Sequence, residues 1–272
     1  MGYRLGMAPL GRVLIIAGSD SGGGAGIQAD IKTVTALGGY AATAVTAITV
    51  QNTLGVSAAF PLAPDLIAAQ ARAVLEDLGA DVIKTGMLGD AAVVEAVAGI
   101  LDAAACPAVI DPVMVAKGGA RLLAADAEAP VRTLLVRRAA LLTPNAPEAE
   151  ALTGLAVQST DDLRRAGEAL LAAGAGAVLM KGGHVPGPRV VDVLITPYGE
   201  TTFEGERIET RHTHGTGCTL ASAVATGLAQ GMALEAACAR AWDYVHRAIL
   251  AAPGLGRGHG PLDHAWPLRS RP

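Results

Sequence analysis

Short apolar runs alternate with longer amphipathic segments along most of the chain. The run 12–17 (RVLIIA) ends at a glycine and is typical of a strand buried on both faces of a sheet. Further strands are predicted over 41–50, 81–84, 108–110, 140–142 and 177–180, and a hairpin over 190–196 and 201–203. Helices are predicted over 27–37, 64–78, 91–104, 127–136, 146–152, 161–173, 220–230 and 234–250.

This alternation indicates βαβ units, and therefore an α/β fold with a mostly parallel sheet covered on both faces. No low-complexity linker divides the chain. We therefore expect an N-terminal tail over 1–11 and a single domain over 12–272.

Polar residues follow the predicted strands at the point where each one ends. They are Asp20, Gln51, Lys84, Asp111, Asn145 and Lys181. Ligands of open α/β sheets bind beyond the carboxyl ends of the strands. The pattern therefore predicts a binding site at that edge of the sheet.

The octet 212–219 (HTHGTGCT) precedes an uncharged, helical stretch. Gly215, Thr216 and Gly217 would form the first turn, where unpaired N–H groups and the helix dipole favour an anion. Cys218 lies where the same field would stabilise a thiolate. The octet therefore favours phosphoryl or acyl transfer, with close helix–sheet packing of the two glycines as the alternative.

The loop 18–26 (GSDSGGGAG) allows two further interpretations. Residues 24–29 fit the dinucleotide pattern G-x-G-x-x-A after a strand, but no acidic residue ends the next strand to bind a ribose. A P-loop is excluded because no Gly-Lys-Ser or Gly-Lys-Thr occurs. The remaining alternative is a tight turn that needs positive φ.

Three further groups of residues suggest phosphate or metal chemistry. Asn145 and Glu148 form a capping-box pattern, and their oxygens also suit Mg²⁺ and its water ligands. Lys181 precedes two glycines that would let a phosphate approach the backbone. His212 and His214 form an H-x-H pair that lacks a nearby third metal ligand.

Composition narrows the functional classes. Hydrophobic residues make up 51% of the chain, aromatic residues only 3%, and the net charge is −4. There is no basic stripe, so nucleic acid is not expected as a partner. The longest uncharged stretch is interrupted by glycines, Asn52 and Pro61, so no membrane span is expected. Three cysteines without metal-ligand spacing favour a cytoplasmic location.

Seven blocks occur in an order that resembles the bacterial hydroxymethylpyrimidine/phosphomethylpyrimidine kinases of thiamine biosynthesis, which are ribokinase-like enzymes. They are AGSDSGGGAGIQAD (17–30), TAITVQNT (46–53), KTGML (84–88), DPVMVAKGG (111–119), TPNAPEAEALTG (143–154), VLMKGGH (178–184) and THGTGCTL (213–220). The ending GRGHGPLDH is also similar to that family. The resemblance covers nearly the whole chain beyond the first ten residues.

The resemblance implies a three-layer α/β/α sandwich and a homodimer. It implies phosphorylation of 4-amino-5-hydroxymethyl-2-methylpyrimidine by ATP and Mg²⁺, followed by phosphorylation of the monophosphate to the diphosphate. A monovalent cation is a further expected cofactor.

The resemblance also assigns residues. Gln51 would hydrogen-bond the pyrimidine edge, in a pocket lined by Gly18, Ala25, Asp30, Met87 and Val113. Asp111, Asn145 and Lys181 would bind the nucleotide phosphates, with Glu148 and Asp111 holding Mg²⁺ through water. Cys218 would act as the base, with Gly215, Thr216, Gly217 and Lys181 in the catalytic group.

Two alternatives remain open. Many ribokinase relatives carry Asp where this chain has Cys218, which argues against a sugar kinase. Pyridoxal-type kinases share similar ring substrates and some also carry Cys, so they are the first alternative. The second is a pyrimidine-binding sensor in which the kinase site is idle.

Overall fold

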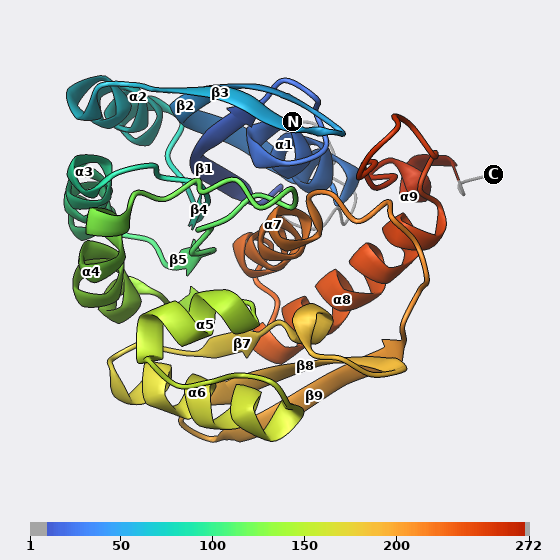
Figure 1. Cartoon of the computed structure of the whole chain (residues 1–272). Helices are drawn as coiled ribbons and strands as arrows, with labels where there is room; N and C mark the ends of the chain where they lie inside the picture. Colours follow the sequence, from blue (N-terminus) through green and yellow to red (C-terminus); the bar gives the residue numbers. More distant parts are fainter. Residues whose placement is uncertain (1–9, 270–272) are drawn as a thin grey trace, which may run out of the picture.

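A computed structural model describes residues 10–269, and these form a nine-stranded sheet between two layers of helices (Figure 1). The strand order is β3-β2-β1-β4-β5-β6-β7-β8-β9. The strands are β1 (Arg12–Asp20), β2 (Tyr40–Asn52), β3 (Gly55–Pro61), β4 (Val82–Thr85), β5 (Ala108–Ile110), β6 (Leu141–Leu142), β7 (Val178–Met180), β8 (Arg189–Thr196) and β9 (Gly199–Glu206).

Six strands, β2-β1-β4-β5-β6-β7, pair in parallel, and the outer strands pair antiparallel. The prediction of a mostly parallel α/β sheet is confirmed. The helices are α1 (Gly26–Ala36), α2 (Pro64–Asp77), α3 (Ala91–Ala103), α4 (Glu128–Pro130), α5 (Ala146–Thr153), α6 (Thr160–Ala172), α7 (Thr216–Ala229), α8 (Leu234–Leu250) and α9 (Trp266–Arg269).

The two faces of the sheet have separate apolar cores. One core packs the sheet against α2, α3, α5 and α6, and the other packs it against α1, α7 and α8. The small side chains of α7 allow this helix to pack closely, and every residue from Thr219 to Gly227 is buried. The small residues of α7 therefore leave this helix enclosed by protein on most sides.

Two segments of the structure differ from the prediction. The edge strand β3 was not predicted, because its mostly exposed residues and terminal Pro61 lack the pattern of a buried strand. The helix predicted over 127–136 is a succession of short 3₁₀, α and π turns over 125–138, because Pro130 interrupts regular hydrogen bonding.

The predicted domain boundary falls at the start of β1. Residues 1–9 of the predicted tail lie outside the described residues, and Gly11 accepts a hydrogen bond from the Tyr40 amide (2.9 Å). Within the described part, no helix is both long and apolar enough to cross a membrane.

Candidate active site

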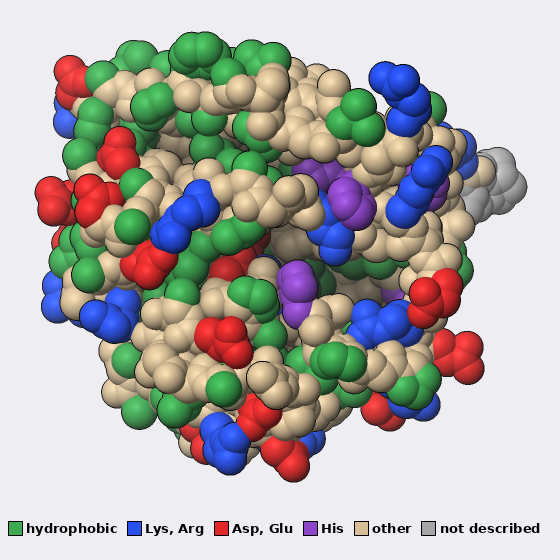
Figure 2. Space-filling model, in the orientation of Figure 1, with side chains coloured by type: hydrophobic (Ala, Val, Ile, Leu, Met, Phe, Trp, Pro, Cys, Tyr) green, Lys and Arg blue, Asp and Glu red, His purple; other side chains and the backbone are tan. Residues whose placement is uncertain are grey.

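All of the predicted strand-end polar residues except Lys84 line a cavity of about 520 Å³ at the carboxyl edge of the sheet. Figure 2 shows the hollow near the middle of the face in view, with histidines at its rim. Gly18, Ala25, Gln51, Met87 and Val113 line one part of it, as expected from the sequence. Asp111, Asn145, Glu148, Lys181 and the turn 215–218 line another part.

Asp30 does not line this cavity, contrary to expectation. Its carboxylate is fully buried, accepts bonds from Lys84 Nζ at 2.9 and 3.0 Å, and accepts another from Ser222 Oγ at 2.7 Å. Burial lowers the pKa of Lys84, but the charge and hydrogen bonds of Asp30 together with the nearby Asp111 charge outweigh it and hold that pKa above its usual value. Asp30 and Lys84 are therefore a buried ion pair between α1 and β4, behind the site.

The glycine-rich loop is organised by Asp20, the last residue of β1. Asp20 Oδ1 accepts from the Gly22 amide (2.8 Å), and Oδ2 accepts from the amides of Gly24 (3.1 Å) and Ala25 (2.8 Å). Burial raises the pKa of Asp20, but its bonds to His214 and Ala25 outweigh that effect and lower it overall. The loop is therefore a turn folded around an ionised carboxylate.

The first turn of α7 faces the cavity. Gly215 is the N-cap residue with φ +85°, and a Cβ there would lie 1.8 Å from the Gly24 oxygen. The first i→i−4 bond runs from the Thr219 amide to the Gly215 oxygen (2.9 Å), so the amides of Gly217 and Cys218 precede the helical bonding pattern. Such amides can bind an anion, and only glycine fits where the two loops meet.

Cys218 is half-buried, and its thiol is not the activated group predicted from the sequence. Burial raises its pKa to about 12, against the lowering effects of Lys84 and of the Gly26 amide. The helix start favours a thiolate, but the loss of hydration at this closely packed position has the larger effect on the pKa. At neutral pH the free protein therefore carries a thiol at this position.

Lys181 lies between two carboxylates, in the same part of the cavity as Asp111 and Asn145. Its Nζ donates to Asp111 Oδ1 at 2.8 Å and is 3.6 Å from Glu148 Oε2. Burial lowers the pKa of Lys181, yet the two carboxylates outweigh this and keep it above its usual value. A Cβ on Gly217 would lie 3.2 Å from Lys181 Nζ, so the ammonium lies beside the first turn of α7.

Glu148 and Asn145 form the predicted capping box at the start of α5. Glu148 Oε2 accepts from the Asn145 amide (2.8 Å), and Asn145 Oδ1 accepts from the Glu148 amide (2.9 Å). Burial raises the pKa of Glu148 to about 7, against the lowering effect of Lys181. Glu148 therefore caps the start of α5 and also has a raised carboxyl pKa.

The residues fit a hydrated Mg²⁺ better than a metal held by protein alone. Asp111 Oδ2 is buried and has no hydrogen-bond partner among the described residues. Within residues 10–269, no three His, Cys, Asp or Glu side chains are grouped to hold a metal. Mg²⁺ is commonly bound by one or two carboxylates together with water and phosphate, which matches Asp111 and Glu148.

The H-x-H pair does not form a metal site. His214 Nε2 lies 2.8 Å from Asp20 Oδ2 and 3.2 Å from Gln51 Nε2 in the side-chain amide. His212 points elsewhere, with its Nδ1 buried against the loop at Gly260. The contacts of His214 with Asp20 and Gln51 were not predicted, because both residues are far from His214 in sequence.

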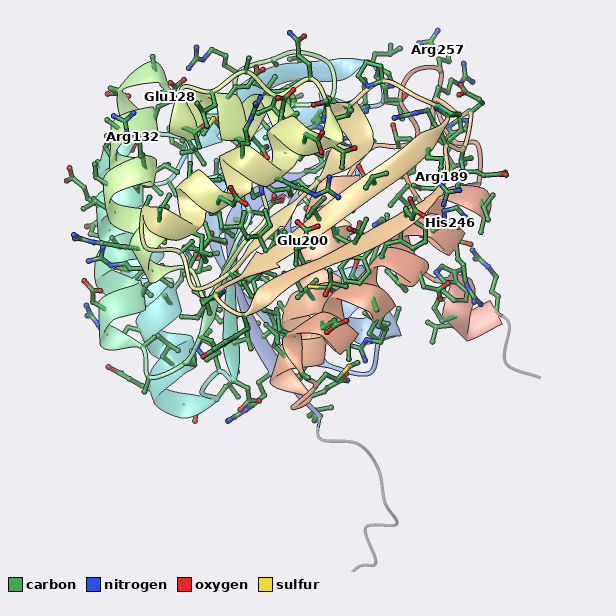
Figure 3. All side chains as sticks on the ribbon, turned by 90° about the horizontal axis from the view of Figure 1, so that it is seen from below. Glu128, Arg132, Arg189, Glu200, His246 and Arg257 are labelled. Carbon is green, nitrogen blue, oxygen red and sulfur yellow. The ribbon has the colours of Figure 1, made fainter. Side chains whose placement is uncertain are left out.

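A second cavity of about 360 Å³ adjoins the first and shares Asn145, Lys181 and Gly217 with it. Its apolar side chains come from β8, α7, α8 and the segment after β9: Val190, Ile208, Leu220, Trp242, Val245 and Ile249. His246 stacks on Trp242 at 5.2 Å and lies at the same end of the β8–β9 hairpin as Arg189 (Figure 3).

The glycines after Lys181 have different roles in this arrangement. Gly183 lines the second cavity and has open space where a Cβ would be. Gly182 is buried against β8, and its Cβ would lie 1.9 Å from the Val191 oxygen. Only Gly183 is therefore placed to admit a phosphate, and Gly182 is required for packing.

Comparisons with known proteins agree on one family. A family model described as phosphomethylpyrimidine kinase matches residues 20–263. The hydroxymethylpyrimidine/phosphomethylpyrimidine kinase of Streptomyces coelicolor is 50% identical over 256 residues, 94% of this chain and 95% of that protein. The Clostridium difficile phosphomethylpyrimidine kinase structure is 39% identical with a TM-score of 0.79, covering 88% of this chain and 99% of its own.

A pyridoxal kinase from Bacillus subtilis, solved as an ADP complex, is also similar in structure. It is 36% identical with a TM-score of 0.89 and covers 97% of this chain and all (100%) of its own. Structures of both kinds of kinase therefore share this ribokinase-like fold, and the family model and the Streptomyces coelicolor relative at 50% identity are both phosphomethylpyrimidine kinases. The chain belongs to the phosphomethylpyrimidine kinase family.

Proposed function

We propose that this protein transfers the γ-phosphoryl group of ATP to 4-amino-5-hydroxymethyl-2-methylpyrimidine, and then phosphorylates the resulting monophosphate in thiamine biosynthesis. The observation that carries the proposal is the meeting of two cavities at Lys181 and the first turn of α7. One cavity has room for a small ring substrate beside the phosphate-binding residues, and the other has the apolar walls that suit a nucleotide base.

In this arrangement the nucleotide base would occupy the second cavity, with its phosphates directed toward Lys181 and Asn145. Lys181 and the amides of Gly217 and Cys218 would bind the charge on the transferring phosphoryl group. Asp111 and Glu148 would hold Mg²⁺ through water, which would neutralise further phosphate charge. Catalysis of phosphoryl transfer depends mainly on such positioning and electrostatic stabilisation.

The two steps place different demands on Cys218. A hydroxymethyl acceptor must lose a proton as the new P–O bond forms, whereas a phosphate acceptor already carries an anionic oxygen. In our proposal the thiolate form of Cys218 accepts that proton, supported by the buried Lys84 ammonium and by the Gly26 amide. Because its pKa is about 12, the rate of the first step should increase with pH from 7 to 9.

A substrate panel tests the proposed function. Hydroxymethylpyrimidine, its monophosphate, pyridoxal and ribose are incubated with Mg-ATP, and ADP and product mass are measured. We expect phosphorylation of both pyrimidines at rates well above those of pyridoxal and ribose. Preferred turnover of pyridoxal would instead support the pyridoxal kinase alternative, which the structural similarity to the Bacillus subtilis enzyme motivates. Ligand binding without ADP formation would support the sensor alternative.

We also propose a cytoplasmic homodimer. The three cysteines are free, in keeping with a reducing compartment.

On β2 and β3, Ile48, Val50 and Phe60 have exposed fractions of 51%, 51% and 59% and belong to paired strands. An exposed apolar group of this kind is typical of an interface. Sedimentation should give a dimer for the wild type and a monomer for Phe60→Asp, with Tyr198→Asp as an exposed control; a monomeric wild type would contradict the proposal.

A further inference from the structure

A row of hydrogen-bonded side chains runs from Asp20 through His214 to Gln51. It borders the part of the larger cavity where the acceptor ring would bind, which we call the acceptor side, and lies away from Lys181 and Asp111, which we call the phosphate side. His214 Nε2 is 2.8 Å from Asp20 Oδ2 and 3.2 Å from the terminal amide of Gln51. Asp20 and His214 are only 3% and 9% exposed, so neither can exchange its partner for bulk water. The position of the proton between Asp20 and His214 therefore determines which way round the Gln51 amide faces the cavity.

Asp20 can act only as an acceptor. Three backbone amides donate to its carboxylate, and its pKa is lowered overall, so it is ionised at neutral pH. The proton between Asp20 and His214 must then lie on His214 Nε2. This holds for neutral imidazole and for imidazolium, because Nε2 carries hydrogen in both.

The His214 donor restricts the orientation of the Gln51 amide. The single Nε2 hydrogen points to Asp20, and the Gln51 atom 3.2 Å away can only share it as a weaker second acceptor. An amide NH₂ group at that place would face an N–H group, so His214 favours the Gln51 orientation that turns the amide oxygen, rather than Nε2, toward the ring. The other amide atom lies 3.2 Å from Thr49 Oγ1, whose hydroxyl donates to the Ser19 oxygen at 2.9 Å. Thr49 is thereby left as an acceptor, and it requires the NH₂ group of Gln51 on its side.

The neighbours also hold the imidazole ring in place. His214 donates its backbone N–H to the Gly260 oxygen (3.1 Å) and pairs in a parallel bridge with Pro261. A Cβ on Gly24 would lie 2.5 Å from His214 Cδ2, so the glycine-rich loop packs directly on the ring. Neither His214 nor Thr49 can then adapt freely to a rotated Gln51 amide.

We propose that His214, fixed by Asp20, locks the Gln51 amide so that the site accepts 4-aminopyrimidines and rejects 4-oxopyrimidines. An unrestrained glutamine amide can rotate by 180° and pair equally well with either ring. A 4-aminopyrimidine offers an amino donor next to the N3 acceptor, and this pattern matches an amide with a fixed oxygen and NH₂. The 4-oxo ring presents the reverse pattern. The inference rests on the proposed pyrimidine substrate and makes His214 a positioning residue.

Calorimetry tests the proposal by comparing 4-amino-5-hydroxymethyl-2-methylpyrimidine with its 4-oxo analogue in the absence of ATP. We expect the wild type to bind the amino compound at least about tenfold more tightly, which corresponds to one discriminating hydrogen bond. In His214→Phe, which keeps a ring of similar size, the ratio should fall to within about threefold. His259→Phe, an exposed histidine outside the cavity, should keep the wild-type ratio.

A second variant and the protonation of His214 test the same restraint on Gln51 independently of His214→Phe. Thr49→Val should also reduce the amino-over-oxo ratio, because it removes the acceptor on the NH₂ side of Gln51 without changing the histidine. ¹⁵N NMR of the ligand-free wild type should show His214 protonated at Nε2. An unchanged ratio in His214→Phe and Thr49→Val, or an Nδ1-H tautomer, would overturn the proposal. Absence of pyrimidine turnover would contradict only the proposed kinase function, since the binding ratio is measured without ATP.

Discussion

Two buried carboxylates, one on each side of the candidate site, have pKa values shifted in opposite directions. Asp20 on the acceptor side accepts three backbone amides and contacts His214, and its pKa is lowered. Glu148 on the phosphate side accepts one amide, and burial raises its pKa to about 7. The surroundings therefore decide the direction: bonds from His214 and the backbone outweigh burial at Asp20, whereas burial and the nearby Asp111 charge dominate at Glu148.

This difference suggests two ways of building a site. The acceptor side is internally satisfied, so it can hold a ring in a fixed orientation. The phosphate side contains a carboxyl group with an unusual pKa and, in Asp111, a buried oxygen without a partner. We infer that the phosphate side is completed electrostatically by nucleotide phosphates and Mg²⁺, whereas the acceptor side is preformed.

The largest effect is expected where the two sides meet. Gly215→Ala would place a Cβ 1.8 Å from the Gly24 oxygen at φ +85°, which displaces the first turn of α7 from the glycine-rich loop. We expect kcat/KM to fall more than about 100-fold for both acceptors, the scale of losing an oxyanion-type donor. Gly231→Ala is the matched control, because its φ is +81° but it has no atom within 4 Å of the new Cβ. Similar losses in both variants would assign the effect to backbone strain alone.

Asp20→Asn should weaken the acceptor side specifically. Asparagine keeps one acceptor oxygen in place of two, so we expect a loss of about 1–3 kcal/mol in the free energy of unfolding at pH 7. The lowered pKa of Asp20 means that its contribution is present above its unfolded pKa and is lost as the pH falls through its folded pKa. The difference between wild type and variant, measured by urea unfolding, should therefore shrink between about pH 5 and 3. A difference independent of pH would contradict an ionised Asp20.

Glu148→Gln should give the opposite pH dependence. Because the folded pKa is raised to about 7, the wild type binds an extra proton on folding and loses stability as the pH rises from about 4.5 to 7. Glutamine keeps the capping acceptor without the charge. The variant should match the wild type near pH 4 and be more stable by about 3 kcal/mol at pH 8 in the absence of ligand. A less stable variant at pH 8 would show that the Lys181 pairing outweighs the burial of Glu148.

Much of this architecture follows from the sequence, because alternating apolar runs and strand-end polar residues depend on local pattern. The edge strand β3 and the broken helix over 125–138 did not follow, since exposed edges and mixed turns carry little periodicity. Within the site, the positions of Gln51, Lys181 and Glu148 at the cavity were predictable from their places after strands.

The burial of Asp30 and the high pKa of Cys218 were not predictable, because both depend on packing between distant segments. The same limitation applies to His214, which is separated from Asp20 by 194 residues in the chain. Sequence pattern therefore indicates which residues reach the edge of the sheet, and tertiary contacts determine their charge and orientation.

The difference between the two phosphorylation steps is tested most directly by Cys218→Ala. We measure its kcat/KM with hydroxymethylpyrimidine and with the monophosphate under the same Mg-ATP conditions. We expect a loss of at least about 100-fold for the hydroxymethyl acceptor, on the scale of general base catalysis, and a loss below about fivefold for the phosphate acceptor. Equal losses for both acceptors would contradict the proposed base and leave Cys218 as a packing residue in the first turn of α7.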